Sequence, residues 1–294
     1  MGGINLNALH VKNVSVKIDY FSLKNITFAV EQGTVCGLIG RNGAGKTSLL
    51  HTILDQVARK NGVIDYFNQG VLTTELKQKI GVVWATNPFP PQKKIIDLKM
   101  FYASIYPNWD EAYFSKLCIQ FQIDLQKKVR QLSTGQLANL QLILALSYHP
   151  DLLILDEPTA HLDPFTRDQV LQLLMNFMLH EEHSILMSSH YIDDFEKISD
   201  TILVLEDGEI LFHETKDDLQ SNYLIWRYTQ QAARPFNTAA VISERKHALS
   251  THYLLDKSLL TDTFLQQEES QLSVPSIEDY LLFMNYLPQE GEQY

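Results

Sequence analysis

The chain alternates short apolar runs with longer stretches that have one apolar face, and this pattern predicts an α/β fold. Four largely apolar runs are typical of strands buried in a sheet. They lie at residues 35–39, 152–156, 184–188 and 202–206. Residues 1–34 instead alternate apolar and polar positions, as short antiparallel strands do. From about Asn87 to Pro150 the pattern is helical, so we expect a mixed β core with a helical region inserted between its strands.

A glycine-rich motif follows the first buried run. It reads G-x-x-x-x-G-K-[ST] and comprises Gly40, Arg41, Asn42, Gly43, Ala44, Gly45, Lys46 and Thr47, with Ser48 next in the chain. In such a loop, backbone N–H groups face phosphates, the lysine reaches the terminal ones and the threonine hydroxyl binds Mg²⁺. A glycine-rich turn can match by accident, but here a predicted strand enters the loop and an amphipathic helix leaves it. The motif therefore predicts a site for a nucleoside triphosphate and Mg²⁺.

Two carboxylates end the second apolar run, at Asp156 and Glu157, just before Pro158. Ligands of α/β sheets bind at the carboxyl ends of the strands, where this run delivers both side chains. Asp156 is then placed to hold Mg²⁺, and Glu157 to polarise a water molecule against the terminal phosphate. In isolation the motif also fits an acidic turn stopped by proline, but its combination with the glycine-rich loop favours the site.

The segment ahead of this run, residues 132–136, reads LSTGQ. It resembles the L-S-G-G-Q signature of the nucleotide-binding subunits of ATP-binding-cassette (ABC) transporters. The glycine-rich loop and the LLILDEP run occur in the family order, residues 160–163 match its D-loop, and His190 resembles its switch histidine. The resemblance covers about the first three-quarters of the sequence.

This resemblance implies an ATPase with a P-loop NTPase fold: a RecA-like core, an N-terminal antiparallel β subdomain, and a helical subdomain at residues 86–149. The cassette would span residues 1–222, and residues 223–294 would form a small C-terminal α+β appendage of unknown role. ATP and Mg²⁺ are the implied ligands. The implied partners are transmembrane permease subunits and a second cassette, from the same or a different chain, at the cytoplasmic face of the cell membrane.

The resemblance also assigns roles to individual residues. Glu157 would act on the attacking water and His190 on the terminal phosphate, whereas Ser133, Gly135 and Gln136 would contact the nucleotide of the partner cassette. Taken alone, Ser133 and Gly135 would favour an ordinary helix cap, and His190 a hydrogen-bonded structural residue. An aromatic ring that stacks on adenine is expected before the loop. Tyr20 and Phe21 are the candidates; we choose Tyr20, although both also suit a hairpin core.

One expected residue is missing. The family places a glutamine, which contacts Mg²⁺ or the attacking water, at the loop that enters the helical subdomain, and this position falls on Ala85. Alanine has no polar atom to offer, and Asn87 would serve only in a shifted register. Two functions therefore stay open: an ATPase that powers a bacterial exporter, or an ATP-gated dimerisation switch that hydrolyses weakly. The stretches FYASIYPNWD and KISDTILVLEDG resemble the YtrB-like group of exporter ATPases, which favours the first.

Composition excludes several other classes. The formal net charge of −11 argues against nucleic acid as a partner. A P-loop kinase would not account for the LSTGQ segment at residues 132–136. The two cysteines, Cys36 and Cys118, lie in apolar surroundings and fit buried thiols better than a disulfide. No apolar run approaches the roughly 18 residues of a membrane span, and residues 1–7 lack the features of a secretion signal.

Two regions carry less specific patterns. The aromatic side chains at residues 101–109 suit either the core of the helical subdomain or a groove that receives a transmembrane subunit. After about Asn222 the cassette motifs stop, and the pattern predicts strands at 239–243 and 251–255 and a short helix opened by Pro275 and Ser276. Packing of this helix on its own domain is the simpler expectation, with a partner interface as the alternative.

Overall fold

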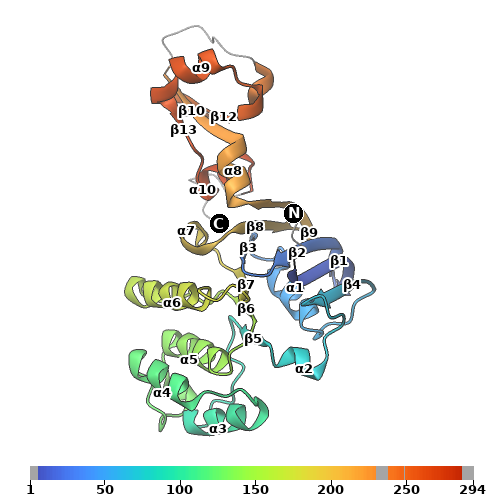
Figure 1. Ribbon diagram of the computed structural model, residues 1–294, viewed down its shortest axis with the longest axis vertical. Helices are drawn as coiled ribbons and strands as arrows, with labels where there is room; N and C mark the ends of the chain where they lie inside the picture. Colours follow the sequence, from blue (N-terminus) through green and yellow to red (C-terminus); the bar gives the residue numbers. More distant parts are fainter. Residues whose placement is uncertain (1–5, 230–237, 248, 287–294) are drawn as a thin grey trace. The chain divides into compact units, whose positions relative to one another are not determined.

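The computed structural model describes residues 6–229, 238–247 and 249–286, and the chain divides into two compact units, residues 1–213 and 214–294. The sequence-based prediction that residues 1–7 are not a secretion signal concerns mostly residues 1–5, which lie outside the described residues. The boundary follows His213, earlier than the predicted residue 222, because the helix α8 (Lys216–Asn222) packs on elements of the second unit. Figure 1 gives the order of the elements.

The first unit contains two sheets. Six strands form the main sheet in the order β5 (Ile80–Val83), β6 (Leu152–Asp156), β7 (Ser184–Ser188), β3 (Val35–Ile39), β8 (Thr201–Glu206) and β9 (Glu209–Thr215). The five strands from β5 to β8 run parallel. A three-stranded antiparallel sheet has the order β2 (Phe21–Glu31), β1 (Asn7–Ile18) and β4 (Asn61–Tyr66). The predicted strands are therefore confirmed in both regions.

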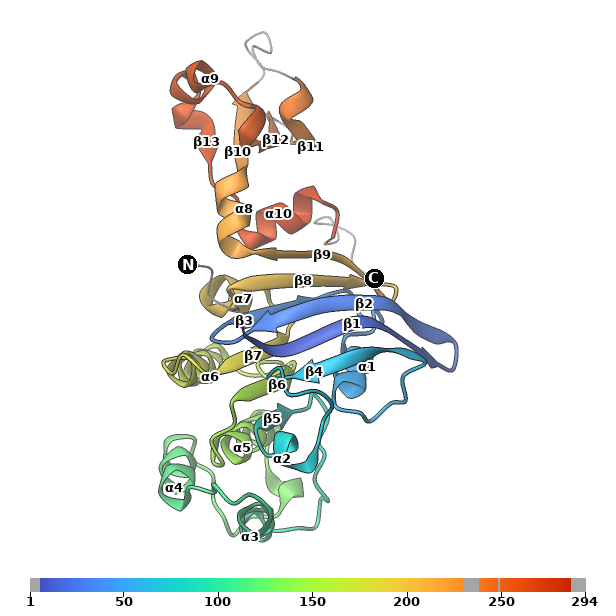
Figure 2. The same cartoon turned by 45° about the vertical axis from the view of Figure 1, so that its right-hand side comes forward.

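The two sheets share one hydrophobic core with the helix α1 (Lys46–Ile53). Buried side chains of the antiparallel sheet, such as Val14 and Ile26, belong to the same cluster as Leu49 of α1 and Leu186 of β7. Figure 2 shows the antiparallel strands in front of the main sheet. This packing fixes the start of α1, and with it the glycine-rich loop, against the strand ends.

Helices occupy the remainder of the first unit. Beyond the edge strand β5, three of them gather as the predicted helical subdomain: α3 (Ile95–Ile105), α4 (Glu111–Gln120) and α5 (Thr134–Leu146) (Figure 1). The others are α2 (Thr74–Lys77), α6 (Pro164–Phe177) and α7 (Ile192–Ile198). Among the described residues, none of the helices combines the length and apolar character that crossing a membrane requires.

Both cysteines are buried and free, as the sequence predicts. Burial raises the pKa of the Cys36 thiol in β3 to about 12. It raises the pKa of Cys118 in α4 to about 12 as well, with a further contribution from the charge of Glu111. Both thiols are therefore protonated and unreactive at neutral pH.

The second unit has a four-stranded antiparallel sheet in the order β11 (Val241–Lys246), β12 (Ser250–Asp256), β10 (Tyr223–Thr229) and β13 (Leu272–Ser273). The predicted strands at 239–243 and 251–255 correspond to β11 and β12, and the predicted short helix is α10 (Ile277–Phe283), capped by Ser276. The helices α8 and α9 (Asp262–Gln267) and the strands β10 and β13 were not predicted.

Trp226 anchors a separate core in this second unit. Its side chain is fully buried among Tyr253, Leu255 and Phe264, and its indole N–H donates to Glu268 Oε2 at 3.1 Å. Each unit thus has its own buried cluster, which is the physical basis for treating it as a separate folding unit.

Trp226→Ala is expected to destabilise the second unit by about 3–5 kcal/mol, because the substitution leaves a large cavity in its core. Hydrogen exchange followed by mass spectrometry is the measurement. Peptides from β10 and β12 should exchange faster, while those from β3, β6 and β7 keep wild-type protection. Equal loss of protection in both units would contradict the two-unit description.

Candidate nucleotide-binding site

The order of the parallel strands gathers the predicted site residues at one edge of the sheet. The strand β7 lies between β3 and β6, and all three run in the same direction. The glycine-rich loop follows β3, the two carboxylates end β6, and His190 follows β7. Three motifs that lie far apart in the sequence therefore meet at the carboxyl ends of neighbouring strands, where α/β sheets bind ligands.

Close packing holds the glycine-rich loop in place. A side chain at Gly40 would put its Cβ 2.4 Å from the carbonyl oxygen of Leu205, and one at Gly45 would lie 2.4 Å from the ring of Phe21. Gly45 also has a φ of +106°, which favours glycine. Lys46 Nζ donates to the carbonyl oxygen of Gly40 at 2.6 Å, so the lysine folds back over the loop that precedes it.

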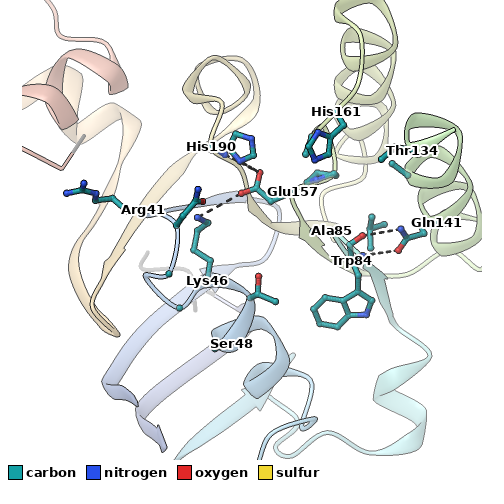
Figure 3. Close-up of a pocket in the computed structure, with 18 of the residues that line it drawn as sticks. Arg41, Lys46, Ser48, Trp84, Ala85, Thr134, Gln141, Glu157, His161 and His190 are labelled. Atoms are coloured by element: carbon teal, nitrogen blue, oxygen red, sulfur yellow. Dashed lines mark hydrogen bonds and ion pairs between the residues drawn. The ribbon is translucent and has the colours of Figure 1, made fainter. Parts of the chain in front are cut away.

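The members of the loop face different directions. Asn42, Gly43, Lys46, Thr47 and Ser48 line one cavity together with Arg41 and Gly45. Ala44 is buried. In Figure 3 the Arg41 side chain points away from Glu157 and His190, while the Lys46 side chain points toward Glu157. Lys46 is thus the residue of this loop whose charge is directed at the predicted catalytic carboxylate.

Asp156 is a buried carboxylate at the end of β6, with 2% of its surface exposed. Its Oδ2 accepts a hydrogen bond from Thr47 Oγ1 at 2.9 Å, and its Oδ1 accepts one from Ser188 Oγ at 2.7 Å. The carboxylate therefore bridges the start of α1 to the end of β7. Sequence reasoning did not single out the role of Ser188 in this arrangement.

The oxygen donors of Thr47 and Asp156 suit Mg²⁺, a hard cation that binds one or two protein oxygens together with phosphate and water oxygens. Among the described residues, no group of three or more His, Cys, Asp or Glu side chains is arranged to hold a metal ion. Thr47 and Asp156 would supply two oxygens to Mg²⁺, and phosphate and water oxygens would complete its coordination.

Glu157 lies between two cationic or titratable groups (Figure 3). Its Oε2 is 2.7 Å from His190 Nδ1 and accepts the backbone N–H of His190 at 3.2 Å, and its Oε1 is 3.9 Å from Lys46 Nζ. The backbone of Glu157 has a φ of +52°, which is unfavourable for a residue with a side chain. Its N–H donates to Ser188 Oγ at 3.0 Å, which helps to hold this conformation. The structure thus brings together the Glu157, His190 and Lys46 side chains that the sequence singles out.

The cavity bounded by these residues has a volume of about 400 Å³, which is in the range of small-molecule sites. One wall is formed by the loop and Phe21, and the other by residues of the helical subdomain and the D-loop, including Thr134, Gln141 and His161. Ala85 also lines this cavity, at the position where the family would place a glutamine.

Tyr20 does not line this cavity. Its side chain is fully exposed, whereas its neighbour Phe21 packs against Gly45 and forms part of the wall. The choice of Tyr20 as the adenine-stacking residue therefore has no support in the structure, and Phe21 is the aromatic residue at the pocket. Both belong to the hairpin between β1 and β2, and their order in this turn, which the sequence pattern does not determine, decides which ring faces inward.

The signature residues form a helix cap. Ser133 Oγ accepts the N–H of Gln136 at 3.1 Å, and Gln136 Oε1 accepts the N–H of Ser133 at 3.3 Å, a reciprocal arrangement that begins α5. Ser133, Gly135 and Gln136 line a second cavity, with Asp163 and other D-loop residues, and they do not line the one that contains Lys46. Within one chain they are therefore not positioned on the nucleotide held by its own loop.

Gln141 of α5 is a site residue that sequence reasoning missed. Its side chain is 5% exposed and forms two hydrogen bonds with the backbone of Trp84: Oε1 accepts the N–H at 3.0 Å, and Nε2 donates to the carbonyl at 3.1 Å (Figure 3). The Trp84 ring stacks on His51 of α1, with centroids 4.2 Å apart. These contacts fix the end of β5, next to Ala85, between α1 and α5. A polar residue inside the apolar stretch 140–146 was the available signal.

Asp194 of α7 is a second missed residue. Its fully buried carboxylate accepts hydrogen bonds from Thr159 Oγ1 at 2.6 Å and from Arg167 Nε at 2.7 Å, and lies 3.3 Å from Ser189 Oγ. These contacts join the segment just before the D-loop, α6 and the segment that carries His190. Asp194 therefore positions the catalytic candidates without lining the cavity itself.

The aromatic stretch of the helical subdomain divides between packed rings and an exposed apolar hollow. Tyr102 stacks on Tyr106, which stacks on Tyr148 at 3.6 Å between centroids, so these rings are core. Phe101 is 59% exposed and, together with Pro88, Phe89 and Leu98, lines an apolar hollow of about 450 Å³.

Comparison with known proteins agrees with this geometry. The family model described as ABC transporter matches residues 23–160. The YtrB ABC transporter ATP-binding protein of Bacillus subtilis is 34% identical over 203 residues, which cover 69% of this chain and 70% of the relative. The energy-coupling factor transporter ATP-binding protein EcfA2 of Clostridioides difficile is 27% identical, over 71% of this chain and 77% of the relative.

A solved structure has the same fold. It is the dimeric, post-hydrolysis state of the ATP-binding cassette MJ0796 with ADP and Pi, with a TM-score of 0.60 and 22% identity over 70% of this chain and 98% of that one. The described fold, the meeting of the loop, carboxylates and histidine at the strand ends, and the match to YtrB lead to one conclusion: the chain belongs to the ATP-binding subunits of ABC transporters.

Proposed function

We propose that this chain is an ATPase that powers a bacterial exporter through nucleotide-driven dimerisation. The observation that carries the proposal is the position of Glu157, held between His190 and Lys46 above a buried Asp156. A carboxylate in this place suits the polarisation of a water molecule that attacks a terminal phosphate.

The roles of the residues follow from their geometry. Lys46 and the backbone N–H groups of the loop bind and orient the phosphates of ATP. Thr47 and Asp156 hold the Mg²⁺, which when bound neutralises charge on the phosphate oxygens. Glu157 accepts a proton from the water. The backbone N–H of His190 donates to this carboxylate at 3.2 Å and holds it in place, and the His190 side chain contacts the terminal phosphate. Phe21 provides the apolar wall on which the adenine rests.

Dimerisation explains the placement of the signature. Ser133, Gly135 and Gln136 begin α5 at a cavity separate from the chain's own loop, and the N–H groups at a helix start attract anions. In a head-to-tail pair of cassettes these groups contact the partner's nucleotide. The second cassette is a copy of this chain or a related subunit.

The exposed apolar hollow beside Phe101 and Phe89 receives a transmembrane permease subunit, which keeps the chain on the cytoplasmic face of the membrane. The export direction rests on the resemblance of residues 101–110 to the YtrB-like group of exporter ATPases.

Ala85 supports a second candidate function, an ATP-gated dimerisation switch with weak hydrolysis. Ala85 lines the nucleotide cavity. Its methyl side chain has no polar atom to offer to a metal ion or a water molecule. ATP turnover by the purified chain separates the two functions, because the switch binds ATP and dimerises but releases little phosphate.

Glu157→Gln is expected to reduce ATP turnover about 10²-fold or more, because the amide does not accept the proton of the attacking water. ATP binding should be retained, and size-exclusion chromatography with light scattering should show a dimer that persists with ATP and Mg²⁺. Glu182→Gln, an exposed position after α6, is the matched control and should behave as wild type. Turnover unchanged in Glu157→Gln would refute the role of this residue.

Gln141→Leu preserves side-chain volume but leaves the N–H and carbonyl of Trp84 without partners. We expect the protein to lose about 1–3 kcal/mol of stability, and the kcat for ATP to fall while binding of ADP is retained. Urea denaturation and steady-state kinetics measure both effects. Gln172→Leu, on the exposed face of α6, is the control. A variant with wild-type kcat would show that the two hydrogen bonds from Gln141 to Trp84 have a structural role only.

A further inference from the structure

The second unit carries a row of basic side chains that none of the cassette motifs explains. Arg227 of β10 pairs with His252 of β12, and His252 pairs on its other side with Arg245 of β11. Paired residues of neighbouring strands point to the same face of a sheet. The three side chains therefore form one row across three strands.

This row lies on the face opposite the Trp226 core, since Trp226 and Tyr253 are the sequence neighbours of Arg227 and His252. It opens into a cavity of about 230 Å³. His247 and Asp279 also line this cavity, and Leu282 and Phe283 of α10 form its apolar wall. Ser243 Oγ donates to the carbonyl of Phe283 at 2.8 Å, which attaches α10 to this face of the sheet.

The charges in the cavity are not balanced among the described residues that line it. Arg227 and Arg245 flank the His252 imidazole, and Asp279 is the one carboxylate in that lining. Arg245 Nη2 is buried and has no hydrogen-bond partner in the described part of the chain. Asp279 already accepts hydrogen bonds through Oδ2 from the N–H and hydroxyl of Ser276 at the start of α10. A buried donor without a partner is costly, and a bound acceptor removes that cost.

His247 and His252 both line this cavity. His252 Nε2 is 3.1 Å from Ser250 Oγ, and its ring centroid is 4.2 Å from that of His247. Burial lowers the pKa of His252, and the nearby His247 and Arg227 lower it further, while Asp279 acts in the opposite direction. An anion in the cavity would favour the protonated imidazole, so its binding would be accompanied by proton uptake.

We propose that this cavity binds a phosphate group, either free or as the end of a small phosphate monoester. About 10 Å of sheet separates the Cα atoms of Arg227 and Arg245, a span from which two arginine side chains converge on one anion. Arginine forks match phosphate oxygens in pairs. Arg227, His252 and Arg245 supply donors from three strands. A phosphate group offers these donors more acceptor oxygens than the two of a carboxylate, so phosphate is the better fit. The apolar wall accommodates the carbon portion of an ester.

The test is isothermal titration calorimetry on the full chain saturated with ADP and Mg²⁺, so that the nucleotide site is already filled. Inorganic phosphate, sulfate and glycerol 3-phosphate are the soluble probes, and vesicles with phosphatidic acid represent a lipid source. We expect saturable binding of one anion per chain. Arg245→Gln and Arg227→Gln should each weaken it at least about tenfold. A preference for glycerol 3-phosphate or for vesicles then identifies the free or the lipid form.

Lys246→Gln is the matched control, because it removes a positive charge from the same strand at the neighbouring position, on the other face of the sheet. It should bind as wild type. Sulfate keeps its charge between pH 6 and 8, so its affinity should rise as the pH falls and His252 becomes protonated. Circular dichroism confirms that each variant is folded, and the exposed Arg227 provides a test if Arg245→Gln does not fold.

Three results would overturn the proposal. The first is the absence of saturable binding of any probe up to about 10 mM, because a specific phosphate site would have a higher affinity than that. The second is equal weakening by Lys246→Gln and the arginine variants, which would show attraction to net charge rather than to this cavity. Histidine NMR resonances of His247 and His252 that do not shift with phosphate would contradict it as well.

Discussion

The buried hydroxyl of Ser188 is the contact on which the site depends. It donates to Asp156 Oδ1 and accepts the N–H of Glu157, so one side chain at the end of β7 fixes both carboxylates at the end of β6. Thr47 completes the arrangement from α1. Because a buried carboxylate is costly unless it is hydrogen-bonded, the strand ends must remain in register for Asp156 to keep its two hydrogen bonds. The same register holds Glu157 in its left-handed conformation and directs it toward Lys46 and His190.

Further contacts connect this site to the elements that surround it. Asp194 joins the segment just before the D-loop to the segment of His190, and Gln141 joins the end of β5 to the signature helix. The two hydrogen bonds from Gln141 to the backbone of Trp84 lie beside Ala85, where the family's glutamine is missing. A side chain of α5 and a backbone segment of β5 therefore connect the helical subdomain to the wall of the cavity.

The sequence predicted the parts of this structure that local pattern and motif spacing determine. The apolar runs identified β3, β6, β7 and β8, and the motifs located Lys46, Asp156, Glu157 and His190, because each side chain follows directly from its strand. It did not predict residues whose role depends on a tertiary partner. Gln141 acts on Trp84, 57 residues away, and Phe21 rather than Tyr20 faces the cavity because of the turn between β1 and β2. In the second unit, β10 was missed because its pairing with β12 is not visible in a local pattern.

We propose that Thr47 and Asp156, whose carboxylate Ser188 holds in place, bind the metal ion that accompanies ATP. The most direct test compares ATP affinity with and without Mg²⁺ for the wild-type chain and for Asp156→Asn, by isothermal titration calorimetry. We predict that Mg²⁺ strengthens ATP binding to the wild type and that this gain is largely lost in Asp156→Asn, while metal-free affinity is kept or increased. An equal gain from Mg²⁺ in both proteins would contradict the account.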